Sequence, residues 1–314
     1  MTDLIIPLGT GSRWKNNELR YALRSYDKYF KDLGTVYIVG PKAYIKKNLP
    51  WLQNVVVVDC DDPFNRNKDG NLIRKVLRVI DNYPELTDDF VRASDDQLLW
   101  DEVDSLPPLY TYNLKDKPQA WWMRGNRWKV RLKKTMRILE VKKKTTWNYD
   151  AHIPMTVNKH KFKEVWSKFP WERSIGYCIN TLYYNMALDK HTHFDNKKLS
   201  VEQAVAAPNV LPMQLRGKKY LGYNDAGLND HLKALIKKRF PDKCRFEEGY
   251  KDPEEEILTP PVFKDKTLKT EPKNKVKTLN DMTKKEIIEE YGLNPKDMRL
   301  TKAKLIELCG VTSD

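Results

Sequence analysis

Short apolar runs alternate with longer amphipathic segments over the first hundred residues. The short runs are residues 3–8, 35–40, 55–58 and 90–94. They are too short for helices and nearly continuous, which is typical of strands buried on both faces. Apolar residues recur at helical spacing from about Asn17 and again from about Asn71. This alternation predicts βαβ units around a largely parallel sheet, and therefore the α/β class.

Polar groups follow three of the expected strands. They are the loop from Gly9 to Trp14, the segment Asp59 to Asp62, and Asp95-Asp96-Gln97. Ligands of open α/β sheets bind at the carboxyl ends of the strands. We therefore expect these three segments to form a nucleotide-binding half at one edge of the sheet.

The adjacent carboxylates of Asp95 and Asp96 are the strongest candidate for a metal site. Two anions held together at the end of a buried strand repel each other, and a divalent cation relieves the repulsion. Mn²⁺ or Mg²⁺ at this pair would bridge the diphosphate of a nucleotide sugar and take up charge as the leaving group departs. An acidic pair in an ordinary loop is the alternative interpretation.

Several residues are candidates for contacts to the nucleotide sugar. Glycines permit close approach of the backbone to a ligand, Arg13 suits phosphate, and Trp14 suits stacking on a base. Cations and amides at the start of the second helix favour phosphate as well, although solvated helix charges would look the same. The candidates are Gly9, Thr10, Gly11, Arg13, Trp14, Lys68, Asn71, Lys75, Asn224 and Asp225.

Asp150 and His152 are the candidates for the base that deprotonates an acceptor hydroxyl. They alternate along one short segment, so they need not share a face. Of His191 and His193, one could complete the metal site, and we take His193 as the third metal ligand. A polar loop is the alternative for both of these histidines.

The second half of the chain predicts three further regions. Two helices are expected near 159–168 and 176–188, within an acceptor half that spans 101–247 and completes a catalytic domain of residues 1–247. Residues 248–277 are rich in Lys, Pro, Glu and Thr and are expected to be a flexible linker. Residues 278–314 predict two short helices in a helix-extended-helix arrangement.

Six motifs, in order over about 220 residues, resemble Stealth-type sugar-phosphate transferases and related phage and bacterial glycosyltransferases. Residues 18–25 are similar to their E-L-R-Y-S-L-R-S helix, and residues 67–76 to their N-K-D-x-N segment. Residues 89–96 are similar to D-F-x-x-x-x-D-D. The other matches are 36–40 with 50–52, 150–154 with an H-x-P motif, and 223–225 with a terminal L-N-D.

The resemblance implies a GT-A-like, Rossmann-like mixed sheet flanked by helices, a nucleotide-sugar donor and a divalent metal at Asp95 and Asp96. It also implies nucleotide or phosphate contacts from Lys68, Asn71 and Asp225, and a catalytic role near His152. The T-W-V-D-G element that opens the Stealth proteins is replaced here by residues 8–14. Plain glycosyl transfer is therefore expected rather than phosphosugar transfer, with a UDP-sugar as the expected donor.

The formal charge of +14 favours a polyanionic partner, because the cations are clustered. Ten Lys or Arg stand against one Glu from Arg124 to Lys144, interleaved with tryptophans. Cations with flat rings suit nucleic acid, although a basic helix with core tryptophans is the alternative. The candidate nucleic-acid-binding residues are Trp121, Trp122, Arg124, Arg127, Lys129, Arg131, Lys133 and Lys134. The C-terminal module resembles small SAP or HeH-type modules, many of which bind DNA.

These features predict a glycosyltransferase that acts on a hydroxymethylated pyrimidine in phage DNA. Two alternatives stay open: a transferase that builds a surface or capsular polysaccharide, and a nucleic-acid-binding protein with an inactive transferase fold. No apolar stretch is long enough to span a membrane, and the N-terminus lacks the pattern of a signal peptide. A cytoplasmic protein is therefore expected, with reduced cysteines at its four scattered positions. The oligomeric state is left open.

Overall fold

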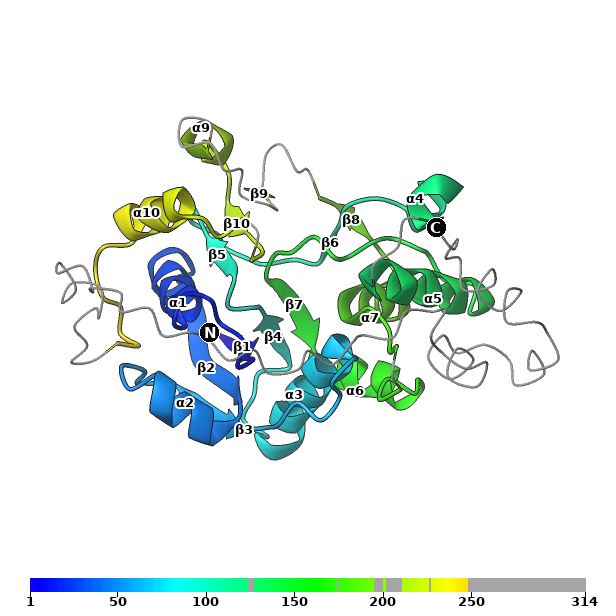
Figure 1. Ribbon diagram of the computed structural model, residues 1–314. Coiled ribbons are helices and arrows are strands. Elements are labelled where there is room, and N and C mark those ends of the chain that lie inside the picture. The colour runs from blue at the N-terminus through cyan, green and yellow to red at the C-terminus, as the bar shows by residue number, and fades with distance from the viewer. Residues whose placement is uncertain (124–126, 174, 195–199, 202–210, 226, 248–314) are drawn as a thin grey trace, which may run out of the picture. The chain divides into compact units, whose positions relative to one another are not determined.

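The computed structural model describes residues 1–123, 127–173, 175–194, 200–201, 211–225 and 227–247 (Figure 1). The predicted linker and helix-extended-helix module lie outside the described residues, so the domain boundary at residue 247 stays a prediction. Helix α4 (Gln119–Met123) falls in a compact unit separate from the rest of the described chain. The fold below is that of the other unit.

A five-stranded sheet forms the centre of this unit. Its strands are β1 (Thr2–Pro7), β2 (Leu33–Gly40), β3 (Val56–Asp59), β4 (Asp89–Arg92) and β7 (Met155–Asn158), in the order β3-β2-β1-β4-β7. The first four are parallel, and β7 pairs antiparallel with β4. Leu4, Ile5 and Ile6 of β1 are fully buried, as the apolar runs predicted. The α/β class with a mixed sheet flanked by helices is therefore confirmed.

The sheet is flanked by helices α1 (Asn17–Tyr29), α2 (Lys42–Asn48), α3 (Lys68–Asn82), α5 (Arg127–Val141), α6 (Lys159–Ser167), α7 (Ile179–Ala187) and α10 (Asp230–Arg239). Right-handed crossovers between parallel strands place α1 and α2 on one face and α3 on the other. Helix α3 begins three residues before the predicted Asn71, because the Asn67 side chain caps it by accepting from Gly70 N. Figure 1 shows α3, α6 and α7 grouped beside β7.

Two small sheets lie outside the central one. One has the order β5-β10-β9, from β5 (Gln97–Leu99), β10 (Tyr220–Gly222) and β9 (Ser200–Val201), and the other joins β6 (Leu109–Tyr110) to β8 (Thr192–His193). The described residues also form a 3₁₀ turn, η1 (Leu114–Asp116), and the short helix α9 (Leu211–Leu215). Strand β5 follows β4 after one tight turn, so β10 brings residues near 223 beside the end of β4.

The last described residues fold back onto helix α1. The Glu247 carboxylate accepts from Arg24 Nε at 2.6 Å and from Arg24 Nη2 at 2.9 Å, and it lies 3.5 Å from Arg20 Nε. The Glu247 side chain is fully buried. This contact holds the carboxyl end of the described chain against the first helix of the sheet.

Candidate active site

Asp95 and Asp96 lie at the carboxyl end of β4, in the turn that connects it to β5. Ser94 N donates to the Gln97 side chain, and Gln97 N donates to Ser94 O, so the turn is closed on itself. Tyr223 N donates to Asp96 O and ties the turn to the chain after β10. The predicted acidic pair is therefore held rigidly at the ligand-binding edge of the sheet.

The electrostatics of the pair are those of crowded carboxylates. Burial, together with the anions of Asp96 and Glu18, raises the pKa of Asp95 to about 7, and the charge of Lys68 partly opposes this shift. Asp96 Oδ1 is buried and has no hydrogen-bond partner among the described residues. An unsatisfied buried carboxylate oxygen beside a second carboxylate suits a hard divalent cation.

His152 lies against the acidic pair. Its Nε2 is 3.2 Å from Asp96 Oδ2 and 2.9 Å from the Tyr223 carbonyl oxygen. Burial lowers the pKa of His152, but Asp96, the Tyr223 carbonyl and Asp150 together raise it to about 9, so the imidazolium is paired with Asp96 at neutral pH. The backbone of His152 is left-handed, with φ of 55°.

Gly222 makes room for this arrangement. A Cβ atom on Gly222 would lie 2.4 Å from the His152 carbonyl oxygen and 2.7 Å from its ring Cδ2. Only a residue without a side chain can occupy this position while His152 keeps its place. Gly222 therefore positions the histidine through its main chain.

The metal site of three ligands is not assembled in the part of the chain that the structure describes. No group of three or more His, Cys, Asp or Glu side chains there could hold a metal ion. The expected third ligand, His193, lies in β8, where its Nε2 is 3.1 Å from the Thr111 carbonyl oxygen. His191 instead contacts Tyr149 and Thr145. His193 is thus corrected to a residue of the β6–β8 ribbon, and Asp95 and Asp96 remain as the residues that fit a cation.

Asp150, the other candidate base, is fixed by the basic helix α5. Its Oδ2 accepts from Trp128 Nε1 at 2.6 Å, and its backbone NH donates to the Asn148 side chain. Its charge contributes to the raised pKa of His152, which places the two side chains in the same electrostatic environment. His152 therefore lies against Asp96, whereas Asp150 is held by Trp128 and Asn148 and acts on His152 through its charge.

The loop after β1 is organised around Glu18 in the first turn of α1. The Glu18 carboxylate accepts from Ser12 Oγ at 2.8 Å and from Trp14 N at 3.2 Å. Trp14 is only 3% exposed and stacks on Tyr21, with ring centroids 5.1 Å apart. The expected stacking of Trp14 on a base is therefore corrected, since its ring belongs to the core.

The glycines of this loop leave open space. A Cβ on Gly9 or Gly11 would meet no atom within 4 Å, so the protein's own packing does not require glycine there. Arg13 and Asp225 form an exposed ion pair at 3.5 Å, which joins the loop to the chain after β10. The neighbouring Asn224 accepts from Gly227 N within a turn. Of the predicted nucleotide contacts, Gly9, Thr10, Gly11 and Arg13 follow β1, which pairs with β4, and Asp225 comes two residues after Tyr223, whose NH bonds to Asp96.

Two of the predicted phosphate contacts are used by the fold instead. Lys75 is 2% exposed, donates to the Leu8 carbonyl at 2.8 Å, and pairs with Asp62 at 2.7 Å. It therefore joins the loops after β1 and β3. The Asn71 amide exchanges hydrogen bonds with the backbone of Phe64. Both assignments are corrected to a structural role, whereas Lys68 is exposed and its charge reaches Asp95.

The basic helix α5 is part core and part surface. Arg131 is buried and donates to Asp69 at 2.8 Å, so its assignment as a nucleic-acid contact is corrected. Burial and the charge of Arg137 lower the pKa of Lys133, and burial and Arg173 lower the pKa of Lys134. Lys133 and Lys134 are therefore half-buried and lie near other cations, and the Lys134 ammonium also lies over the ring of Tyr177.

The remaining predicted nucleic-acid contacts are placed as follows. Arg127 and Lys129 are on the first turn of α5, and both have partners. Trp121 and Trp122 pack edge to face on α4, at 4.8 Å, within the separate unit. Arg124 lies outside the described residues.

The sequence analysis predicted no role for three residues of this edge: Glu18, Gly222 and Asn67. Asn67 donates to the carbonyls of Trp171 and Arg173 and fits between two glycines, Gly70 and Gly176. The sequence signal for Asn67 was its N-cap position before an amphipathic helix. The partners of Glu18 and Gly222 follow from tertiary contacts that no local pattern encodes.

Comparison with known proteins adds one distant likeness. No protein-family model matches the chain, and no curated protein matches it. Among solved structures, it is similar to the apo form of mouse xyloside xylosyltransferase 1, with 11% sequence identity and a TM-score of 0.36. The likeness covers 73% of this chain and 99% of that one. At this TM-score it does not extend to activity or substrate, which must be argued from the residues of the site.

None of the helices in the described ranges is both long enough and apolar enough to cross a membrane.

Proposed function

We propose that this protein is a metal-dependent, GT-A-type glycosyltransferase that moves a sugar from a nucleotide-sugar donor to a hydroxyl group. The observation that carries the proposal is the Asp95–Asp96 pair at the end of β4. One of its oxygens, Asp96 Oδ1, is buried without a hydrogen-bond partner among the described residues. A divalent cation held there, Mn²⁺ or Mg²⁺, would neutralise the pair and the diphosphate of the donor when bound.

The chain's own residues supply the other requirements of the transfer. In the reaction, the bond between the sugar's anomeric carbon and the diphosphate oxygen breaks, and a bond to the acceptor oxygen forms. The acceptor proton goes to a base. Asp150 is the better placed of the two candidates, because Trp128 fixes one of its carboxylate oxygens, whereas His152 Nε2 already carries a proton that it donates toward Asp96 Oδ2 and the Tyr223 carbonyl. His152 then serves to hold Asp96 and the chain at Tyr223 in place.

The loop from Gly9 to Arg13 is the proposed binding site of the donor's phosphates. It offers open space above two glycines and an arginine at its rim, and Lys68 stands beside Asp95. Phosphate is favoured by such cations and by exposed backbone amides. A UDP-sugar is the donor we propose to test first.

The proposed acceptor is DNA, and specifically a hydroxymethylated pyrimidine. The supporting observation is the link between the basic helix and the candidate base, through the hydrogen bond from Trp128 of α5 to Asp150. A polyanion bound along Lys133, Lys134 and Arg137 would thus lie near the residue that accepts the proton. A base within a duplex must be extruded before it can reach such a site.

The test is a transfer assay read by mass spectrometry of nucleosides. The purified protein, Mn²⁺ and a panel of nucleotide sugars are incubated with DNA that contains cytosine, hydroxymethylcytosine or hydroxymethyluracil. A sugar mass added to one modified nucleoside is the expected result. Metal-dependent consumption of a donor without any increment on DNA would overturn the acceptor and favour a glycan. No consumption of any donor would overturn the enzymatic proposal.

A further inference from the structure

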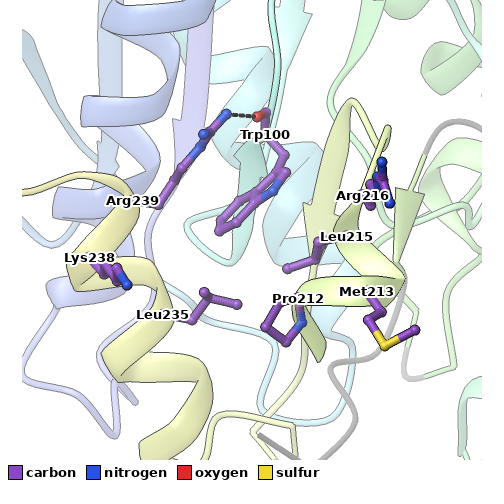
Figure 2. A pocket seen from close by; sticks show the side chains of 8 residues that line it. All are labelled: Trp100, Pro212, Met213, Leu215, Arg216, Leu235, Lys238 and Arg239. Carbon is purple, nitrogen blue, oxygen red and sulfur yellow. Dashed lines mark hydrogen bonds between the residues drawn. The ribbon is translucent and has the colours of Figure 1, made fainter. Parts of the chain in front are cut away.

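A hollow of about 520 Å³ lies at the far end of the β5–β10 ladder from Asp96 (Figure 2). Helix α9 and the turn after it line one side, the last turns of α10 line the other, and Trp100 closes the floor. Its lining residues are Trp100, Pro212, Met213, Leu215, Arg216, Leu235, Lys238 and Arg239. None of the functional residues assigned above belongs to this set, which we call the α9–α10 hollow.

The apolar part of the hollow is unusually open to solvent. Met213 is 76% exposed, one of three large hydrophobic side chains that are exposed among the described residues. Pro212 is exposed and Leu235 is half-buried beside it. Apolar side chains gathered in a concave surface indicate a binding site more strongly than scattered ones do.

The floor of the hollow is rigid. Arg239 donates to the Trp100 carbonyl at 2.9 Å, and its guanidinium lies over the rings of Tyr29 and Trp100. Phe240 packs edge to face on Trp100 at 5.7 Å. A ligand would therefore meet a preformed surface, which lowers the entropic cost of binding.

Two cations without an acidic partner among the described residues flank the apolar part. Arg216 and Lys238 lie on opposite sides of the hollow in Figure 2, and no carboxylate lines it. Asp101 and Glu102 follow Trp100 in the chain and act on Tyr29 together with Arg239, but neither lines the hollow. The charge offered to a ligand is thus positive on both sides of an apolar centre.

We propose that the α9–α10 hollow binds one nucleotide of single-stranded DNA, with the base against Met213 and Leu235 and the flanking phosphates at Arg216 and Lys238. A nucleotide within a strand has an apolar, flat base and a phosphate on either side, which matches this distribution of charge. The inference rests on the proposed DNA acceptor. Asp96 and Trp100 flank β5 four residues apart, or ~13 Å at the usual rise of a strand. The bound nucleotide is therefore a neighbour of the acceptor nucleotide, and the hollow holds the strand in register.

The test compares two fluorescent oligomers of equal length and charge, an oligothymidine and an abasic strand, by anisotropy with the full chain. Met213→Ser should weaken oligothymidine binding about fivefold or more, within the range of one base contact, and leave abasic binding unchanged. The double variant Arg216→Ala/Lys238→Ala should weaken the binding of both oligomers. It should also lower the slope of log affinity against log salt concentration by ~1.4, because each of the two lost phosphate contacts contributes ~0.7.

The matched control is the double variant Lys163→Ala/Lys168→Ala, which removes two exposed, ion-paired lysines outside the hollow. It should change neither affinity beyond about twofold, since only non-specific charge attraction is lost. Equal losses in the control, or equal effects of Met213→Ser on the two oligomers, would overturn the inference in favour of unspecific polyanion binding.

Donor consumption, measured on the same preparations, separates this inference from the proposed function. If the wild type consumes donor but the hollow variants bind DNA as tightly as the wild type, only the inference about the hollow is overturned. The expected binding pattern in a protein that consumes no donor supports the hollow and overturns the enzymatic proposal.

Discussion

His152 and Asp96 form the contact that closes the candidate site, with 3.2 Å between the imidazole Nε2 and Asp96 Oδ2. The two residues come from different strand connections, and Tyr223 joins them through its NH to Asp96 and its carbonyl to His152. One carboxylate oxygen is satisfied by the histidine, and the other, which has no hydrogen-bond partner among the described residues, is where the proposed cation would bind. This division explains how an acidic pair can be tolerated at a half-buried strand end.

Replacing Asp96 by Asn tests the metal assignment. The amide keeps the size of the side chain but cannot provide an anionic ligand, so we expect metal-dependent donor turnover to fall about a hundredfold or more. Retention on DNA should stay unchanged, because the cations of α5 are untouched. Turnover and Mn²⁺ binding by calorimetry are the measurements. Wild-type turnover in Asp96→Asn would exclude the pair as the metal site.

Replacing Gly222 by Ala tests the placement of His152. The new Cβ would lie 2.4 Å from a main-chain oxygen, which cannot rotate away as a side chain could, so the segment at His152 must shift. Because His152 holds Asp96, such a shift would also displace Asp96, and a misplacement of about 1 Å costs on the order of a hundredfold in turnover. We expect kcat to fall with little change in the donor's KM. An unchanged kcat in a folded variant would show that the position of His152 is irrelevant to turnover.

Replacing Gly9 by Ala distinguishes a ligand-facing glycine from a structural one. Its Cβ would point into open space, so we expect the melting temperature to stay within about 1 °C of wild type. If the donor's phosphates approach this loop, the methyl group should raise the donor's KM about tenfold while the fold is kept. Steady-state kinetics beside a thermal melt give both values. A wild-type KM would place the phosphates elsewhere.

The sheet and its ligand-binding edge were predictable because they depend on local patterns. The apolar runs that became β1 to β4 are continuous, and Asp95-Asp96 directly follows one of them. Period and position within the chain were sufficient to place the pair at the correct edge.

The partners within that edge were not predictable, because they depend on tertiary contacts. Trp14, Lys75 and Arg131 have the chemistry of ligand-binding residues, yet each is buried against Tyr21, Asp62 or Asp69. The sequence alone does not distinguish a cationic side chain that forms an ion pair inside the fold from one that binds a phosphate of a ligand. The need for glycine at position 222 likewise becomes apparent only when β10 is placed beside His152.

His191 should make stability depend on pH. Thr145 donates to Asn185, so its oxygen accepts from His191 Nε2, and Nδ1 accepts from the buried Tyr149 hydroxyl. Burial lowers the pKa of His191, which the charge of Lys144 also favours and Asp189 opposes. A histidine with a lowered pKa stabilises the fold above its usual value near 6.5, and that stability is lost as the pH falls below it. Wild type should lose more in melting temperature between pH 7.5 and pH 5.5 than His191→Asn. Equal losses would contradict this.

Glu247 should be essential to the stability of the fold although it lies far from the site in sequence. Its side chain is fully buried between Arg20 and Arg24, and neutralising one partner of a buried ion pair costs about 3–5 kcal/mol. Glu247→Gln should therefore lower the free energy of unfolding by about that amount in urea titrations. The control is Asp27→Asn, which breaks the more exposed pair with Arg245 in the same region and should cost about 0–1 kcal/mol. If the two variants lose equal stability, the contact of Glu247 with α1 is no stronger than a surface ion pair, and residues 240–247 are held by apolar packing of Phe240 and Phe246 instead.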